Sequence, residues 1–342
     1  MGESTINWMY FYRLGRFALG AVAVAVVLLY FFQGKLIFIP SRLDAPPPLP
    51  EMPGRTWEHV TFKTTDGLTL HGVWIGTAGP AGSSTSAAPP PDAPAGGAGK
   101  GQAAPRSPAD TAPGAEPPDT ANAAITASSS AGAASPADDG RPVVLYSHGN
   151  GGNLAFVLYQ LATLATLPVD LFAYDYRGFG QSEGTPDVPG SIRDGEAALR
   201  YLTGERKIPL ERIILYGFSI GTGITMGVAR PHLDRIGGIV LEAGISSLRE
   251  KAYSLFWIFG PLVLTDDFPN SQILGGYHGP LLIVHSKDDE VNKYVNAERL
   301  FAACPSTNKK LLSLTGAHHN DAIHGLPEYL AAWRDFLGRR RR

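Results

Sequence analysis

The chain has 342 residues, 44% of them apolar, which is enough for one large domain with a sizeable core. Its formal net charge of −2 excludes the strongly basic footprint of a nucleic-acid-binding protein. Cys304 is the single cysteine, so an internal disulfide and a cysteine-based metal site are both excluded.

An uncharged apolar run at residues 17–34 lies between Arg16 and Lys35. A helix over this run is about 27 Å long at 1.5 Å per residue, close to the hydrocarbon thickness of a bilayer. Aromatic residues flank it on both sides, as in interfacial belts. We therefore expect a transmembrane signal anchor after a tail of residues 1–16. No small-x-small site follows the run, which disfavours a cleaved signal peptide; a buried core helix is the third interpretation.

The charges beside this run nearly balance, with Arg13 and Arg16 before it and Lys35 and Arg42 after it. A short tail followed by a large domain favours export of that domain. The bias toward Ala, Gly and Pro favours a Gram-negative source. We therefore expect a single-pass protein of the bacterial inner membrane whose main domain lies in the periplasm.

Residues 35–76 are expected to form a juxtamembrane segment and the first strands of the domain, and residues 77–141 an insert. The insert is dominated by Ala, Gly, Pro, Ser, Thr and Asp, with Ile125 as its single large aliphatic residue. Such a composition buries too little apolar surface to offset the entropy of ordering, so the insert is predicted to be disordered. The runs that flank it, 68–75 and 142–147, predict neighbouring strands joined by a long hairpin loop; a lid is the alternative.

Eight strand-like runs are spread over the chain, and after the first two they alternate with helix-compatible segments. This order predicts an α/β fold with a mostly parallel eight-stranded sheet and helices on both faces. The runs lie near residues 57–62, 68–75, 142–147, 170–175, 212–218, 237–242, 281–285 and 310–315. The remainder of the domain is expected to span residues 142–338, before a solvated basic tail at residues 339–342.

A small helical cap is expected at about residues 245–280, between the sixth and seventh runs. Its apolar centre predicts an apolar pocket beneath it, because pockets for acyl groups are lined by aliphatic and aromatic side chains. A membrane-dipping patch and plain core packing are the alternatives. The centre consists of Tyr253, Leu255, Phe256, Trp257, Ile258, Phe259, Leu262, Val263 and Leu264.

The segment Gly217-Phe218-Ser219-Ile220-Gly221 directly follows a strand-like apolar run. Small residues two before and two after a serine permit a strained strand-turn-helix elbow that exposes the hydroxyl. The same spacing also arises for packing reasons. The segment predicts that Ser219 is a nucleophile.

Partners for such a nucleophile follow later in the chain. A serine hydroxyl needs an imidazole as base, and the imidazole needs a carboxylate to orient it. The seventh run leads into Asp288 and Asp289, and the eighth leads into His318 and His319. All of them lie just beyond strand ends, where parallel sheets place their sites. From spacing alone, either acid and either histidine fits.

These motifs resemble the α/β-hydrolase superfamily, in which the order is Ser, Asp or Glu, then His. The likeness is closest to its membrane-anchored, nearly lidless branch of serine-peptidase-like and depalmitoylase-like hydrolases, and it covers roughly residues 30–76 and 141–338. Two further motifs contribute to it, His148-Gly149-Asn150-Gly151-Gly152-Asn153 and Asp175-Tyr176-Arg177-Gly178-Phe179-Gly180-Gln181-Ser182.

The resemblance implies an α/β-hydrolase fold and assigns the site residue by residue. Its His-Gly-x-x-Asp-Glu-Val pattern places the acid at Asp289 rather than Asp288, and its Gly-x-Gly-His-Asn-Asp pattern places the base at His319 rather than His318. Ser219 falls on the nucleophile.

A developing oxyanion needs two preorganised donors. The resemblance implies the backbone N–H groups of Ile220 and Asn150, with Gly151 as the fallback for the second. His148 is expected to brace its turn, and Asp175 and Arg177 to be scaffold.

We therefore expect a membrane-anchored serine hydrolase that cleaves small-molecule or lipid-like acyl esters or thioesters through an acyl-enzyme. No cofactor, metal or nucleic-acid partner is implied. A serine peptidase of the same fold and a non-catalytic membrane-tethered scaffold are the alternatives.

Overall fold

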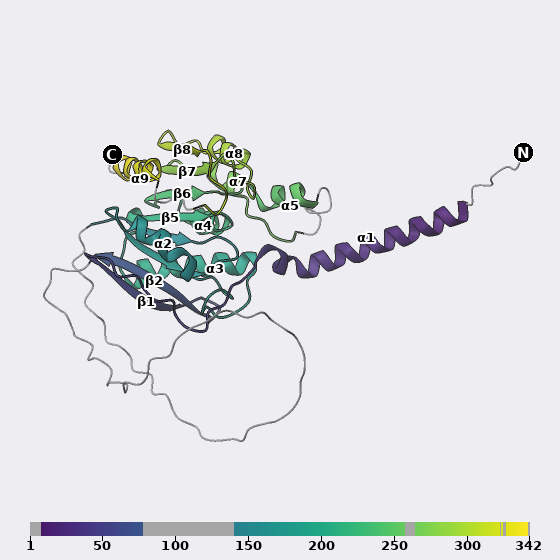
Figure 1. Cartoon of the computed structure of the whole chain (residues 1–342), viewed down its shortest axis with the longest axis horizontal. Coiled ribbons are helices and arrows are strands. Elements are labelled where there is room, and N and C mark those ends of the chain that lie inside the picture. The colour runs from purple at the N-terminus through teal and green to yellow at the C-terminus, as the bar shows by residue number, and fades with distance from the viewer. Residues whose placement is uncertain (1–7, 78–139, 257–263, 322, 324–325, 341–342) are drawn as a thin grey trace, which may run out of the picture. The chain divides into compact units, whose positions relative to one another are not determined.

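A computed structural model describes residues 8–77, 140–256, 264–321, 323 and 326–340. Within these residues, eight strands form one sheet in the order β1-β2-β4-β3-β5-β6-β7-β8 (Figure 1). β2 is antiparallel to β1 and β4, and all other neighbours are parallel, so the predicted mostly parallel eight-stranded sheet is confirmed. The strands are β1 Arg55–Lys63, β2 Thr69–Thr77, β3 Val143–Ser147, β4 Asp170–Tyr174, β5 Ile213–Phe218, β6 Gly238–Glu242, β7 Leu281–Ser286 and β8 Lys309–Leu314.

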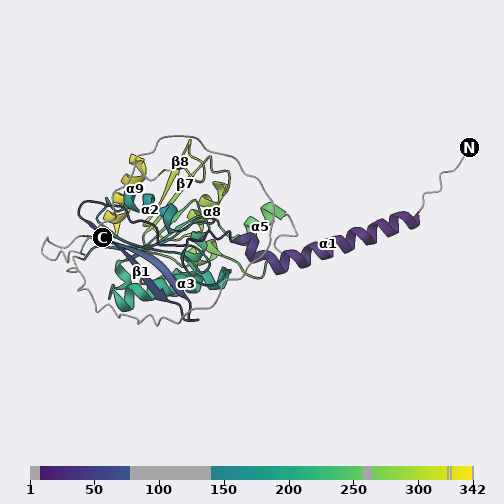
Figure 2. The ribbon, with the colours of Figure 1, turned by 60° about the horizontal axis from the view of Figure 1, so that its bottom comes forward.

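Helices cover both faces of the sheet. Figure 2 shows α2 and α9 on one side and α3 on the other. The inner strands are apolar on both faces because helices cover both sides of the sheet. Successive side chains of a strand point to opposite sides. Val144, Ile214 and Val240 therefore share a core with α2 and α9, whereas Leu145, Leu215 and Leu241 share one with α3 and α4. The helices are α1 Trp8–Ile37, α2 Leu154–Leu164, α3 Val188–Arg200, α4 Gly221–Ala229, α5 Leu248–Phe256, α7 Asn270–Leu274, α8 Val295–Ala303 and α9 Pro327–Arg339, with short turns η1 Tyr201–Glu205, η2 Leu210–Arg212 and η3 Arg230–His232.

The strands on either side of the insert are not neighbours, so the predicted hairpin is wrong. β4 lies between β2 and β3: Leu171 pairs with Ile75 on one side and with Val144 on the other. β3, α2 and β4 form a parallel unit, and β2 pairs with the remaining edge of β4. The end of β2 and the start of β3 are therefore separated by β4. The insert predicted to be disordered is residues 77–141; Thr77 is the last residue of β2, and residues 78–139 lie outside the described residues.

The N-terminal helix α1 spans Trp8–Ile37 and contains the apolar run at residues 17–34. Among the described residues, none of the helices is both long and apolar enough to cross a membrane. The predicted anchor is therefore not confirmed.

Two features near the ends of predicted segments differ from expectation. In the cap region, α5 and α7 are helical as predicted, but Tyr253 is 51% exposed. Residues 257–263, which hold much of the predicted apolar centre, lie outside the described residues.

In the basic tail, Arg339 contacts Asn308 and Asp335, and Arg340 donates to the carbonyls of residues 211 and 237. These two side chains are therefore bonded to the domain rather than solvated.

Candidate active site

Ser219 lies on the tight turn between β5 and α4. Its φ is +54°, in the left-handed region that residues other than glycine rarely adopt. The glycines that flank it are required by close packing. A Cβ on Gly221 would lie 2.1 Å from the Ser147 carbonyl oxygen, and one on Gly217 would lie 2.5 Å from the Gly221 carbonyl oxygen. The turn is further held by the Ser219 N–H, which donates to the carbonyl of Glu242 at 2.9 Å.

The structure brings Ser219, His319 and Asp289 together in one chain of hydrogen bonds. His319 Nε2 lies 3.0 Å from Ser219 Oγ, and His319 Nδ1 lies 2.8 Å from Asp289 Oδ2. Asp289 can only accept when ionised, so Nδ1 carries the proton and Nε2 is the acceptor for the serine hydroxyl. All three side chains are nearly buried. This is the arrangement in which an imidazole removes a proton from a serine.

Asp289 is held as a carboxylate by several donors. Its Oδ1 accepts the backbone N–H groups of Val291 at 2.9 Å and Asn292 at 2.7 Å. Burial alone would raise the pKa of Asp289, but hydrogen bonds from His285, His319 and the Asn292 N–H outweigh it and hold that pKa well below its usual range. A carboxylate that stays ionised is able to stabilise an imidazolium at its other end.

The rival residues at the neighbouring positions lie outside this chain of bonds. Asp288 is exposed, and its Oδ2 accepts the Gly316 N–H at 2.6 Å. His318 is also exposed, and its Nδ1 lies 3.1 Å from Glu290 Oε2. Asp288 and His318 thus stabilise the loops that carry the site.

Two residues beside the site were not singled out from the sequence. His285 Nε2 donates to the Asn292 carbonyl at 2.7 Å and lies 3.3 Å from Asp289 Oδ2. Asn292 Nδ2 donates to the Ala243 carbonyl at 2.8 Å and lies 3.5 Å from Ser219 Oγ. His285 stands in the acid motif, which was a usable signal. No sequence signal pointed to Asn292, because its contacts come from the end of β6 and from the elbow.

The turn after β3 lies against the elbow, as the placement of Asn150 requires. A Cβ on Gly149 would meet the Phe218 ring at 2.7 Å and lie 3.5 Å from Ser219 Cβ, so only glycine permits this approach. Within the described residues, no group accepts a hydrogen bond from the backbone N–H of Ile220 or of Asn150. Both donors are available to a ligand.

The Asn150 side chain is clamped by the segment that follows α1. Its Nδ2 donates to the Ile37 carbonyl at 2.7 Å, and its Oδ1 accepts the Ile39 N–H at 2.8 Å. Between these two residues, Phe38 is 1% exposed and belongs to the core. We call residues 37–44 the strap, since its Ser41 carbonyl also accepts from the Gly180 N–H at 2.8 Å. The strap fastens the end of α1 to the turn that carries Asn150.

His148 and Asp175 form a fully buried pair behind this turn, 3.4 Å apart. His148 Nδ1 lies 2.7 Å from the Gly149 carbonyl, so it carries the proton, and Nε2 faces the carboxyl. Burial lowers the pKa of His148 to about 4 and raises the pKa of Asp175 to about 8. Both shifts favour the neutral forms of the two side chains. His148 braces the turn, as expected from the sequence.

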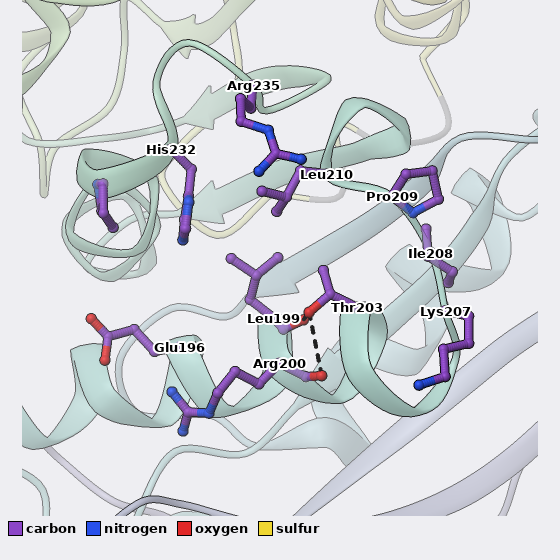
Figure 3. Close-up of a pocket in the computed structure, with 11 residues that line it drawn as sticks. Glu196, Leu199, Arg200, Thr203, Lys207, Ile208, Pro209, Leu210, His232 and Arg235 are labelled. Atoms are coloured by element: carbon purple, nitrogen blue, oxygen red, sulfur yellow. Dashed lines mark hydrogen bonds between the residues drawn. The ribbon is translucent and has the colours of Figure 1, made fainter.

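A separate hollow of about 590 Å³ lies beside the residues that lead into β5 and β6, and Figure 3 draws the side chains that line it. The triad residues follow the carboxyl ends of their strands. Its floor includes Leu199 and Leu210, and Arg200, Lys207 and Arg235 stand around it. None of the predicted site residues lines it, so it is not the candidate active site.

Comparisons with known proteins agree with this architecture. A family model described as the alpha/beta hydrolase fold matches residues 142–261. YfhR of Salmonella typhi, an uncharacterized protein, is 32% identical over 215 residues, which cover 58% of this chain and 72% of YfhR. Protein bem46 of Schizosaccharomyces pombe is 28% identical over 204 residues, which cover 58% of this chain and 68% of bem46.

Among solved structures, the esterase Pf2001 of Pyrococcus furiosus has a similar fold. The TM-score is 0.53 at 16% sequence identity, with 88% of this chain and 98% of the esterase covered. Taken with the match to YfhR, the elbow and the sheet order, these results show that the chain belongs to the α/β-hydrolase superfamily.

Proposed function

We propose that this protein is a serine hydrolase that cleaves esters or thioesters with an apolar acyl group. The observation that carries the proposal is the hydrogen-bonded chain from Ser219 Oγ through His319 to Asp289, at 3.0 and 2.8 Å. An ordinary hydroxyl is a poor nucleophile at neutral pH, and this arrangement is what activates it.

The chemistry follows from the positions of the protons. His319 Nε2 takes the Ser219 proton as Oγ bonds to the substrate carbonyl carbon, and the carbonyl oxygen becomes an oxyanion held by the N–H groups of Ile220 and Asn150. The imidazolium then gives that proton to the leaving alcohol or thiol, and the acyl group stays on Oγ. Water, deprotonated by His319, attacks the acyl-enzyme; Ser219 recovers its proton and the acid is released.

Apolar side chains near the triad support an apolar acyl group. The Phe218 ring centroid lies 5.3 Å from that of His319. Phe156 is 68% exposed and lies against the turn that carries Asn150, since a Cβ on Gly152 would lie 3.7 Å from the Phe156 Cβ. Apolar walls with a few placed polar groups are typical of small-molecule sites.

The test uses the full-length protein with 4-nitrophenyl butyrate and a fluorophosphonate probe. Ser219→Ala and His319→Ala should each lower kcat by about 10⁴-fold or more, because the residues act as one unit. Ser219→Ala should also abolish labelling, whereas Ser313→Ala, at an exposed position of β8, should keep both activity and labelling. Undiminished labelling of Ser219→Ala contradicts the proposal. Faster turnover of aminoacyl amides than of esters would assign the protein as a peptidase instead.

We further propose that residues 17–34 anchor the protein in the bacterial inner membrane, with the hydrolase domain in the periplasm. The absence of charge from this run supports the proposal, as do exposed apolar side chains of α1 such as Phe17, Leu19 and Val24. Reporters fused after Arg42 test it: one active only after export should work, and one active only in the cytosol should not. The reverse result would invert the topology, and release of the protein by carbonate washing would exclude the anchor.

A further inference from the structure

A second pocket adjoins the candidate active site. It has a volume of about 510 Å³ and lies between α5, the loop after Asp289 and the first turns of α8. Its lining residues are Glu250, Lys251, Tyr253, Glu290, Val291, Lys293, Val295, Asn296 and Arg299.

The chain segment that lines this pocket also contacts the nucleophile. Val291 and Lys293 line the pocket, and Asn292 between them places its Nδ2 3.5 Å from Ser219 Oγ. A substrate that extends from Ser219 to the pocket would therefore pass along this segment.

Three basic and two acidic side chains line the pocket. Arg299 pairs with Glu250 at 2.8 Å. Glu290 accepts the backbone N–H of His319 at 3.2 Å and lies 3.1 Å from the His318 ring. Arg299 and Glu250 thus offset each other's charge, and Glu290 is bonded to the histidine loop.

The two lysines, Lys251 and Lys293, affect each other. Lys251 Nζ donates to the Val291 carbonyl, and burial lowers the pKa of Lys251. The ammonium of Lys293 lowers that pKa further, whereas Asp289 opposes the change. Lys293 is exposed, and no carboxylate of the described residues pairs with it. An anion placed between two ammonium groups relieves their repulsion.

Apolar surface accompanies these charges. Tyr253, Val291 and Val295 are 51%, 41% and 43% exposed, and all three line the pocket. Cationic groups beside exposed apolar side chains suit a ligand that is both anionic and partly apolar.

We propose that this pocket binds the acidic group, a carboxylate or a phosphate, of an ester substrate whose reacting carbonyl lies at Ser219. The role in substrate binding rests on the proposed function. The carboxylate or phosphate of the substrate contacts Lys251 and Lys293, and the apolar spacer between this group and the ester lies along Val291 and Tyr253. Lys293 is thus a specificity residue for acidic esters.

Binding is tested first, without reference to catalysis. Pentanoate, butyl phosphate and neutral pentanol are titrated by calorimetry into the full-length protein and into Lys293→Gln, Lys293→Glu and the exposed control Lys63→Gln. We expect both anions to bind at least about tenfold more tightly than pentanol, and Lys293→Glu to remove that preference. Raising the salt concentration should weaken the anions only. Equal binding of pentanol, or anion binding unchanged in both Lys293 variants, overturns the proposal.

Hydrolysis then shows which side of the ester carries the acid. One pair of substrates is mono-4-nitrophenyl adipate with its neutral methyl ester, and the other is 1-butyrylglycerol 3-phosphate with 1-butyrylglycerol. In one pair, Lys293→Gln should lower the ratio of kcat/KM for the charged to the neutral ester by about tenfold. Hydrolysis with unchanged ratios in both pairs refutes the pocket as a substrate site. Anion binding without hydrolysis of any ester refutes the proposed hydrolase but keeps the anion site.

Discussion

Asp289 and its neighbours show how one carboxylate is selected from two adjacent ones. Asp289 is 3% exposed and accepts two backbone N–H groups besides the His319 ring, whereas Asp288 is exposed and bonded to Gly316. A buried carboxylate with several donors holds an imidazole in a fixed tautomer, which an exposed one does not. The choice between them is therefore a matter of burial and hydrogen bonding, not of charge.

Asp289→Asn should lower kcat/KM for 4-nitrophenyl butyrate by on the order of 10³-fold or more, because an amide in that place favours the wrong tautomer of His319. Asp288→Asn is the matched control and should stay within about threefold of wild type. Steady-state kinetics with thermal melts of both variants check this. A larger loss in Asp288→Asn than in Asp289→Asn would show that the acid is the earlier residue.

Asp175 predicts a dependence of stability on pH. Burial raises its pKa from 3.8 to about 8, so the folded protein keeps a proton that the unfolded chain releases. A raised folded pKa adds stability that is complete below the unfolded value and is lost as pH rises through the folded value. The contribution of Asp175 should therefore decline between about pH 4 and pH 8.

Asp175→Asn removes this titration and keeps a neutral side chain facing His148. Its free energy of unfolding relative to wild type should increase by at least about 1 kcal/mol from pH 5 to pH 8.5, since one pKa unit corresponds to 1.36 kcal/mol. Urea denaturation at both pH values measures this, with the exposed Asp44→Asn as the control that parallels wild type. Parallel profiles for wild type and Asp175→Asn would mean that Asp175 is ionised in the folded protein.

At the scale of elements, the turn that carries Asn150 depends on a segment far away in the sequence. The strap meets Asn150 through two hydrogen bonds of 2.7 and 2.8 Å and is itself fixed by the buried Phe38. A donor contributes to catalysis only if it is already aimed when the oxyanion forms. We interpret the strap as the part that holds the Asn150 N–H in place.

Asn150→Ala keeps the backbone N–H but removes both bonds to the strap. It should lower kcat by about tenfold or more while KM for a neutral ester and the melting temperature change little, because Asn150 is exposed and its side chain buries no apolar surface. Gln181→Ala is the control, since that side chain also contacts the strap, at Asp44, but not the turn that carries Asn150. Equal kcat in Asn150→Ala and wild type would exclude a positioning role.

At the scale of the whole molecule, the order of the sheet determines what the insert must span. Ile75 and Val144 lie on opposite sides of Leu171, which places them about 10 Å apart at two strand spacings. A connection of a few residues is long enough for that distance. The length of the insert at residues 77–141 is therefore not a requirement of the fold.

Replacing residues 80–138 by an eight-residue Gly/Ser linker should leave the melting temperature within a few degrees and kcat/KM within about twofold of wild type. The removed segment has Ile125 as its single large aliphatic residue and so has little with which to pack. Calorimetry and ester kinetics on the shortened protein check this. A large loss of activity at unchanged stability would identify the insert as a lid, and a large loss of stability would identify it as part of the core.

Much of the fold could be predicted from local pattern. The eight strand-like runs correspond to the eight strands, because runs of consecutive apolar and β-branched residues reveal both β-propensity and burial. The elbow could also be predicted from consecutive residues. The glycines of Gly217-Phe218-Ser219-Ile220-Gly221 are required by the close contacts that arise wherever a strand turns sharply into a helix.

Only the tertiary structure decided which elements and side chains meet. The position of β4 between β2 and β3 depends on which edge of the sheet β2 joins. The hydrogen bonds between Asn150 and the strap, and the contact of Asn292 with Ser219, join residues more than 70 positions apart. Sequence alone determined that a strained serine, an acid loop and a histidine loop exist in the order of an α/β hydrolase. Their hydrogen-bonded alignment, and the second pocket that adjoins it, follow from packing, because long-range contacts are selected by the fit of whole surfaces and leave no periodic trace in the chain.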